Sequence, residues 1–204
     1  MDDGAIVNMT RSVDPLEIVP WGLSKLFALW LRTTYPIASV GRDLSVHYTL
    51  TLNRSMSPWL KLGNSVVIGK DVWLNVVGED VGELKVIIDD NCSLAARTWI
   101  SARNQIHIER DVHLGPSVLI MDHNHGYEDT ELPIRDQPAT PGGKIRIEQE
   151  CSVGQGAAIM CSRGELVLGR NCIVAPNAVV VRSAPAYSVI SGNPARVVKR
   201  LDLP

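Results

Sequence analysis

Residues 86–120, VIIDDNCSLAARTWISARNQIHIERDVHLGPSVLI, carry an aliphatic side chain at every sixth position, with a single shift of two residues. The same spacing continues on both sides of this stretch. Such repeats are typical of a solenoid, in which stacked units share one core. The aliphatic positions form five series of three: Leu62, Ile68 and Leu74; Ile88, Leu94 and Ile100; Ile108, Leu114 and Ile120; Ile147, Val153 and Ile159; Leu168, Val174 and Val180.

A second position of the repeat lies two residues before the aliphatic one. None of the side chains at this position is charged, although 21% of the residues in the chain are charged. Two such residues point to one face of a short strand. We therefore expect both sets to form the core. The second set comprises Val66, Val72, Val86, Cys92, Thr98, Ile106, Val112, Val118, Ile145, Cys151, Ala157, Leu166, Cys172 and Ala178.

A corner after each short strand would turn the chain through a triangle. Three hexads make one coil of about eighteen residues, and coils stack about 4.8 Å apart. Five series therefore predict about five coils of a parallel β-helix. Glycine often follows an inward aliphatic residue, and we expect four of these glycines at corners that require positive φ. They are Gly69, Gly115, Gly154 and Gly169.

Composition excludes several classes of protein. The 204 residues have a net charge of -2, so a basic nucleic-acid-binding surface is not indicated. Cys92, Cys151 and Cys172 occupy the second repeat position and are expected to be small core residues, whereas Cys161 falls outside it. No CxxC spacing, signal peptide or membrane span is recognised. The simplest expectation is a cytoplasmic protein.

The N-terminal segment predicts a helix. Asp14 and Pro15 resemble a helix start, and Tyr35-Pro36 a helix end. One face would combine Val19, Leu23, Leu26 and Trp30. We expect this helix to cap the open end of the β-helix. The alternative is an interfacial helix that makes a peripheral contact with a membrane.

Interruptions of the repeat are the candidate functional segments. The longest is 121–144, a polar loop rich in Pro and Gly, and three extra residues also separate Ile159 from Leu168. The sequence thus predicts an N-terminal cap and lead-in over 1–59, a β-helix over 60–182 with a protruding loop at 121–144, and a C-terminal turn and helix over 183–204.

Three features resemble the hexapeptide-repeat acyltransferases of the maltose, galactoside and polysaccharide O-acetyltransferase type. They are the hexads, the His-bearing loop MDHNHGYED at 121–129, and the ending YSVISGNPARVVKRL at 187–201. The resemblance covers roughly residues 60–201. It implies a left-handed β-helix, a homotrimer and a short C-terminal helix.

The resemblance also implies a reaction. In this family acetyl-CoA lies between subunits, and a loop histidine deprotonates the acceptor hydroxyl, a role that suits a side chain with a pKa near 6.5. Counting from Ile120 favours His125 as the base, with His123 as the alternative. Asp122 and Tyr127 are candidate substrate contacts in the same loop. No metal is expected.

Acetyl-CoA would need a groove that ends in fixed cations. By resemblance, the corners with Gly154, Gln155 and Pro176 would line the pantetheine arm. The expected cations are Arg182, Arg196, Lys199 and Arg200. The positions that contact sugar in the galactoside and maltose enzymes carry Ala95 and Arg103 here. Arg103 is kept as a candidate substrate contact, and a different acceptor is expected.

Other functions share this fold. An amino-sugar N-acyltransferase would use the same base and groove. A γ-type carbonic anhydrase would need three zinc-binding histidines, and here His107 and His113 are six positions apart instead of that family's usual five. A non-catalytic β-helix scaffold would need neither the His loop nor the C-terminal cations. The leading hypothesis is O-acetylation of a saccharide or glycoconjugate.

Overall fold

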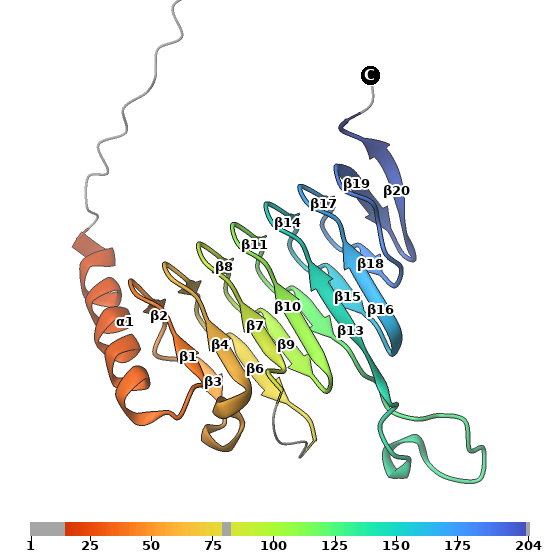
Figure 1. Ribbon diagram of the computed structural model, residues 1–204, viewed down its shortest axis with the longest axis horizontal. Coiled ribbons are helices and arrows are strands. Elements are labelled where there is room, and N and C mark those ends of the chain that lie inside the picture. The colour runs from red at the N-terminus through yellow and green to blue at the C-terminus, as the bar shows by residue number, and fades with distance from the viewer. Residues whose placement is uncertain (1–14, 79–82, 203–204) are drawn as a thin grey trace, which may run out of the picture.

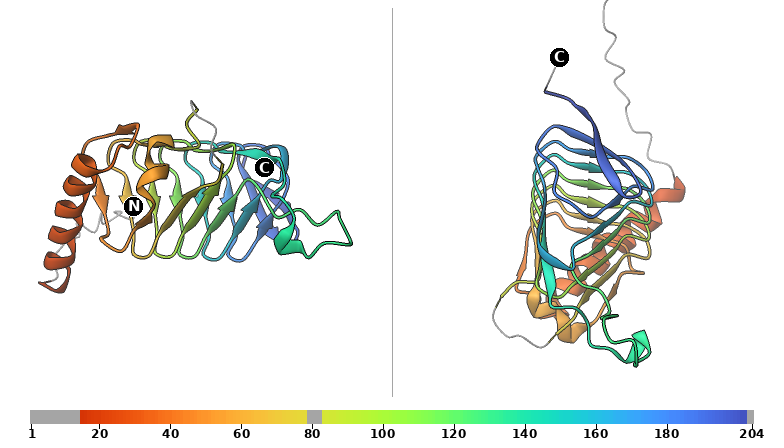
Figure 2. Two further views of the ribbon diagram at one scale, coloured as in Figure 1. Left: turned by 90° about the horizontal axis from the view of Figure 1, so that it is seen from below. Right: turned by 90° about the vertical axis from the view of Figure 1, so that its right-hand side faces the viewer.

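Most of the chain winds into one parallel β-helix (Figures 1 and 2). The structure, a computed structural model, describes residues 15–78 and 83–202, with side chains from Ile18 onward. Helix α1 (Pro15–Thr34) lies across the N-terminal end of the coil. Two 3-10 helices, η1 (Arg54–Trp59) and η2 (Ile134–Asp136), lie in connections between strands.

Each coil contributes one short strand to each of three sheets, named A, B and C. Sheet A contains β1 (Ser39–Val40), β4 (Leu60–Leu62), β7 (Val86–Ile88), β10 (Gln105–Ile108), β13 (Gly142–Ile147) and β16 (Arg163–Leu168). Sheet B contains β2 (Ser45–Val46), β5 (Val67–Ile68), β8 (Ser93–Leu94), β11 (His113–Leu114), β14 (Ser152–Val153), β17 (Ile173–Val174), β19 (Ser188–Gly192) and β20 (Ala195–Arg200). Sheet C contains β3 (Thr51–Leu52), β6 (Trp73–Val76), β9 (Trp99–Ala102), β12 (Leu119–Met121), β15 (Ala158–Met160) and β18 (Val179–Val180).

The strand register places chemically similar residues of successive coils beside one another. Strand β10 pairs with β13 in parallel, so that Ile106 lies beside Ile145 and Ile108 beside Ile147. Every residue of both predicted inward sets is at most 2% exposed. Burial of these apolar side chains is the main stabilising term of the coil. The β-helix predicted from the hexads is therefore confirmed, as is the core position of Cys92, Cys151 and Cys172.

The corner glycines serve close approach and not positive φ. A Cβ at Gly154 would meet the backbone N of Pro176 at 2.6 Å, so the stacked coils leave no room for a side chain there. Positive φ occurs two residues after these glycines, at Asp71, Ser117, Gly156 and Asn171. The expectation that these glycines themselves adopt positive φ was wrong, because the chain bends later in the corner.

The coil begins earlier than the hexad series indicates. Strand β1 already pairs with β4, β2 with β5 and β3 with β6. Within the described residues, sheets A and C therefore hold six strands each, one coil more than the five predicted. The first coil lacks a full set of regularly spaced aliphatic residues, so its spacing carries little signal.

Helix α1 caps the coil, but with a different face from the one predicted. It packs against β2, and Ser24, Ala28 and Leu31 are its buried side chains. Val19, Leu23, Leu26 and Trp30 are exposed instead. Small residues at 24 and 28 let the helix approach the coil closely, whereas the periodicity alone selects the largest apolar side chains.

The C-terminal segment contains a strand where a helix was expected. Residues Ala195–Arg200 form β20, which pairs antiparallel with β19 after the turn at Asn193-Pro194. The prediction of a helix here was wrong. The last coil leaves a strand edge with unpaired backbone groups, and a segment with two consecutive valines, Val197 and Val198, readily pairs with it.

No helix among the residues described has the length and apolarity needed to cross a membrane.

Candidate active site

A cleft of about 540 Å³ lies where the strands of sheet C end and the chain turns toward sheet A. Its walls come from the loop after β12 and from the ends of β15 and β18, so three successive coils contribute to it. The lining residues are His123, Asn124, Gly126, Tyr127, Glu128, Thr140, Met160, Cys161, Ser162, Arg163 and Val181.

Asp122 is a fully buried carboxylate behind the cleft. Its Oδ1 accepts the backbone N–H of Arg103 at 2.6 Å. Its Oδ2 accepts the N–H groups of Asn104 and Gln105 at 2.8 and 2.9 Å. A buried charge needs such partners, and residues 103–105, at the interruption of the hexads between Ile100 and Ile108, supply them.

His123 connects this carboxylate to the cleft. Its Nδ1 lies 3.0 Å from Asp122 Oδ1, and only 10% of its side chain is exposed. A neutral imidazole whose Nδ1–H donates to a carboxylate keeps the lone pair on Nε2. This arrangement orients the ring and leaves a basic nitrogen for a substrate proton.

His125 occupies a different position in the same loop. It forms an isolated backbone bridge with Ala139, and the residue is exposed. It is absent from the lining of the cleft. Asn124 holds the base of this hairpin, because its N–H donates to Thr140 Oγ1 and its carbonyl accepts the N–H of Thr140.

Gln137 organises the distal part of the loop. The side chain is buried, and its Nε2 donates to the carbonyls of Asp129 and Leu132 at 2.7 and 3.0 Å. Its Oε1 accepts the N–H of Asp129 at 3.2 Å. One amide therefore bridges the two arms of the loop that carries His123.

The lining residues Met160, Cys161, Ser162 and Arg163 were not singled out from the sequence. The available signal was the insertion between Ile159 and Leu168, because an interruption at a coil edge places side chains outside the core. Burial raises the pKa of the Cys161 thiol, and this thiol donates to the carbonyl of Arg163 at 3.2 Å. A protonated, hydrogen-bonded thiol is a poor nucleophile.

The other predicted substrate contacts lie close to this cleft. Tyr127 lines it and is largely exposed. Glu128 beside it forms an exposed ion pair with Arg163 at 2.6 Å. Arg103 is tied to the site through its backbone N–H on Asp122, whereas its side chain lies beside Gly142.

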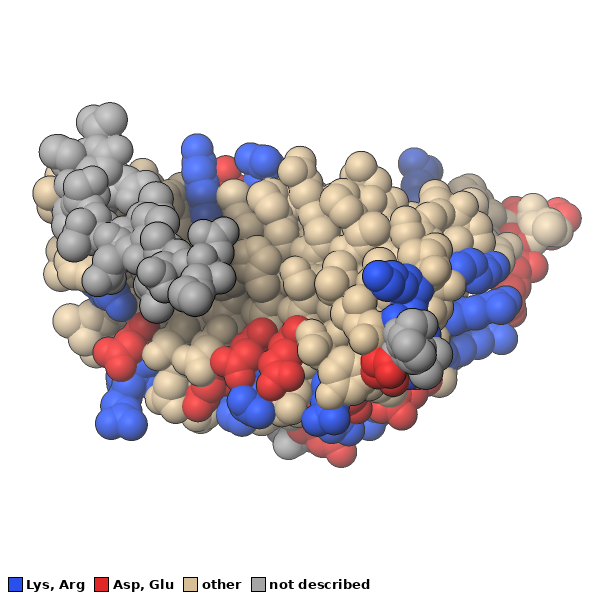
Figure 3. Space-filling view, turned by 90° about the horizontal axis from the view of Figure 1, so that it is seen from above, with Lys and Arg blue, Asp and Glu red and all other residues tan. Residues whose placement is uncertain are grey.

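The residues predicted to bind acetyl-CoA fall into two groups. Gly154, Gln155 and Pro176 form stacked corners between sheets B and C, at the opposite end of β15 from the cleft. Arg182 directly follows Val181 of the cleft lining. Arg196, Lys199 and Arg200 lie on β20, and Arg200 pairs with Asp202. Figure 3 shows Lys and Arg side chains gathered toward the C-terminal end of the coil.

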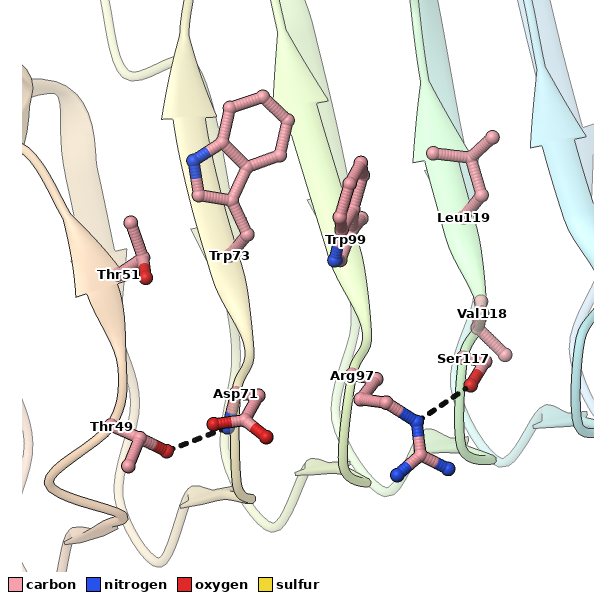
Figure 4. A pocket seen from close by; sticks show the side chains of 9 residues that line it. All are labelled: Thr49, Thr51, Asp71, Trp73, Arg97, Trp99, Ser117, Val118 and Leu119. Carbon is pink, nitrogen blue, oxygen red and sulfur yellow. Dashed lines mark hydrogen bonds between the residues drawn. The ribbon is translucent and has the colours of Figure 1, made fainter.

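The outer face of sheet C carries a second, more open cleft of about 700 Å³ (Figure 4). Trp73 and Trp99 project from adjacent strands, with their ring centroids 5.2 Å apart. Asp71 and Arg97 stand at its edge, and Arg97 Nε donates to Ser117 Oγ at 3.3 Å. The histidines of the coil do not converge: His107 bonds Asp89 on sheet A, and His113 bonds Ser93 on sheet B.

The chain is similar in sequence to two bacterial proteins. A protein of Mycobacterium tuberculosis named as a probable acetyltransferase is 29% identical over 170 residues, which cover 80% of this chain. The chain spans 50% of the length of that relative. WbbJ of Escherichia coli, named for O-acetyl transfer in lipopolysaccharide biosynthesis, is 24% identical over 147 residues, which cover 69% of this chain and 71% of WbbJ. No protein-family model matches the chain.

Solved structures share the fold. AntD, an N-acyltransferase from Bacillus cereus in complex with dTDP and 3-hydroxybutyryl-CoA, has a TM-score of 0.68 at 17% identity, over 84% of this chain and 87% of AntD. A hexapeptide-repeat acetyltransferase from Vibrio cholerae in complex with acetyl coenzyme A has a TM-score of 0.55 at 19% identity, over 94% and 80%. Together with the sequence relatives, these structures confirm the resemblance to hexapeptide-repeat acyltransferases.

Proposed function

We propose that this protein, a β-helix similar to the hexapeptide-repeat acyltransferases, transfers an acetyl group from acetyl-CoA to a hydroxyl of a saccharide, with His123 as general base. The observation that carries the proposal is the buried Asp122–His123 pair, which lies at the edge of a cleft on a loop leaving the coil.

The proposed reaction proceeds by direct attack. His123 Nε2 takes the proton of the acceptor hydroxyl as its oxygen attacks the thioester carbonyl carbon. The tetrahedral intermediate then collapses, the carbon–sulfur bond breaks, and the thiolate takes the proton from the imidazolium. Asp122 holds the ring and stabilises its transient positive charge, as a carboxylate does in catalytic triads.

The choice of His123 over His125 rests on three geometric differences. His123 lines the cleft, is largely buried and has a carboxylate partner, whereas His125 is exposed and lies outside the lining. The proposed acetyl-CoA site extends from this cleft toward the C-terminal end of the coil. Arg182 and the cations of β20 would meet the phosphates there.

A homotrimer would complete the site. The outward residues of sheet C are largely apolar, and they include Trp73, Trp99, Leu119 and Val179. Those of sheet A include Lys61, Lys144, Arg146 and Glu165. We therefore propose that copies pack through sheet C, which would place the His123 cleft at the boundary between subunits.

The test is release of the CoA thiol from acetyl-CoA in the presence of a panel of sugars and glycans, with acetyl-CoA binding measured separately by calorimetry. We expect His123→Ala to lower kcat by about 100-fold or more, with acetyl-CoA binding retained. His125→Ala is the matched control and should stay within a few-fold of the unchanged protein. Full activity of His123→Ala, or absence of acetyl-CoA binding, would overturn the proposal.

A further inference from the structure

The outer face of α1 is an apolar strip that nothing in the described chain covers. Its most exposed large side chains are Leu26 at 66%, Val19 at 65%, Trp21 at 63% and Leu29 at 60%. Ile18, Leu23 and Trp30 extend the strip and are also exposed. Contiguous apolar surface of this kind marks an interaction site.

The two basic residues of α1 lie on the side of the helix that faces the coil. Helix α1 contains one acidic residue, Glu17 near its start, and from residue 18 to its end it contains two cations, Lys25 and Arg32, and no Asp or Glu. Lys25 Nζ lies 3.3 Å from the carbonyl oxygen of Leu44, and Arg32 Nη1 lies 3.4 Å from that of Gly41. Both cations thus stand at the rim between helix and coil, behind the apolar strip.

From this arrangement we propose that α1 docks the protein on the surface of a membrane that contains anionic phospholipid. The apolar side chains would enter the boundary between head groups and acyl chains, and the cationic rim would lie at the level of the phosphates. The exposed indoles of Trp21 and Trp30 suit this boundary, because Trp prefers the interface between water and hydrocarbon.

A second copy would bring Lys25 and Arg32 of two strips to one interface, where like charges repel, whereas anionic lipid pairs with these cations. A second copy is therefore the poorer occupant, and the light-scattering readout below tests it. Figure 2 shows α1 at the N-terminal end of the β-helix, where the outer side of the helix faces away from the coils.

Docking through this end would fix the height of the site. Three coil steps separate β3 from β12, at about 4.8 Å each, and the helix adds about 10 Å. His123 would then stand about 25 Å above the membrane, within reach of a glycan of several sugars carried by a lipid. This consequence rests on the proposed function, whereas docking itself does not.

The test is co-sedimentation of the full chain with vesicles of phosphatidylcholine mixed with phosphatidylglycerol, and with phosphatidylcholine alone. We expect binding to be stronger for the anionic vesicles, and to fall about tenfold or more in Leu26→Glu/Leu29→Glu. The matched control is Val67→Glu/Ile173→Glu, which places the same charges at exposed apolar positions of sheet B. It should bind like the unchanged chain.

A second measurement does not depend on those variants folding. Brominated lipid should quench part of the tryptophan fluorescence of the unchanged chain, and this part should vanish in the double variant Trp21→Phe/Trp30→Phe. Absence of vesicle binding and of quenching would overturn the proposal. It would also be overturned if Leu26→Glu/Leu29→Glu bound normally, or changed only the oligomeric state seen by light scattering. None of these readouts requires acetyl transfer.

Discussion

Asp122 combines two tasks in one side chain. Its carboxylate accepts three backbone N–H groups and holds His123 at 3.0 Å. Each oxygen therefore faces donors only. The same group closes the corner of a coil and, in the proposed mechanism, orients the base, so that stability and activity are coupled at this position.

Replacement of this carboxylate by an amide tests both tasks. In Asp122→Asn one oxygen becomes an NH2 group that faces backbone N–H donors. We expect a loss of about 1–3 kcal/mol in the free energy of unfolding, and a fall in kcat of about 100-fold or more. Denaturant unfolding would measure the loss of stability, and thiol-release kinetics would measure the fall in kcat.

Asp129→Asn is the control for this change, because Asp129 is an exposed carboxylate of the same loop. Asp129→Asn should leave the free energy of unfolding and kcat nearly unchanged. An Asp122→Asn variant with full activity would contradict the role assigned to the pair.

Cys161 lines the cleft but is expected to be chemically silent. Burial raises the pKa of its thiol, so the thiol is protonated near neutral pH. We expect Cys161→Ala to keep kcat within about a few-fold, and mass spectrometry to find no acetylated enzyme during turnover. Accumulation of an acetyl-thioester on Cys161 would show that the reaction uses a covalent intermediate instead of direct attack.

At the scale of elements, the loop after β12 is a structured unit. Its hairpin is closed by Asn124 and Thr140, and its tip is held by Gln137. The loop is long and polar, so it needs these internal bonds to hold His123 in one place.

Loss of the Gln137 amide should loosen this loop. We expect Gln137→Ala to speed hydrogen exchange across residues 124–141 and to raise KM for the acceptor, while the exchange of core strands such as β10 stays the same. Arg135→Ala, at an exposed side chain of the same loop, serves as the control. Unchanged exchange in Gln137→Ala would show that other contacts hold the loop.

At the scale of the whole molecule, the three sheets differ in their outer faces. Sheet A presents charges, whereas sheet C presents the paired indoles of Trp73 and Trp99 (Figure 4). A face of this kind is stable in water when another surface covers it.

Assembly through sheet C is tested by Trp99→Glu. We expect light scattering to detect monomers in place of trimers, and acetyl transfer to fall, because a charge would be buried in an apolar interface. Lys144→Glu, on the outward face of sheet A, should leave the assembly intact. A trimeric Trp99→Glu variant would exclude sheet C as the contact face.

The hexads determined the core because inward positions follow from the alternation of neighbouring side chains along a strand, a local property of the sequence. The interruption of the hexads indicated the loop at 121–144, whereas Asp14 and Pro15 indicated the start of α1. For the base, the resemblance favoured His125, with His123 as the alternative. Both histidines lie in a loop without periodicity, and the contact between His123 and the buried Asp122 forms only in the folded chain.

The sequence by itself thus determined the β-helix, its inward residues and the loop that carries the candidate base. Tertiary structure alone decided which face of α1 packs, that residues 195–200 form β20, and that Met160, Cys161 and Val181 lie around His123. The physical reason is that these outcomes depend on contacts between coils. Residues about 20 to 60 positions apart become neighbours only when successive coils stack at about 4.8 Å.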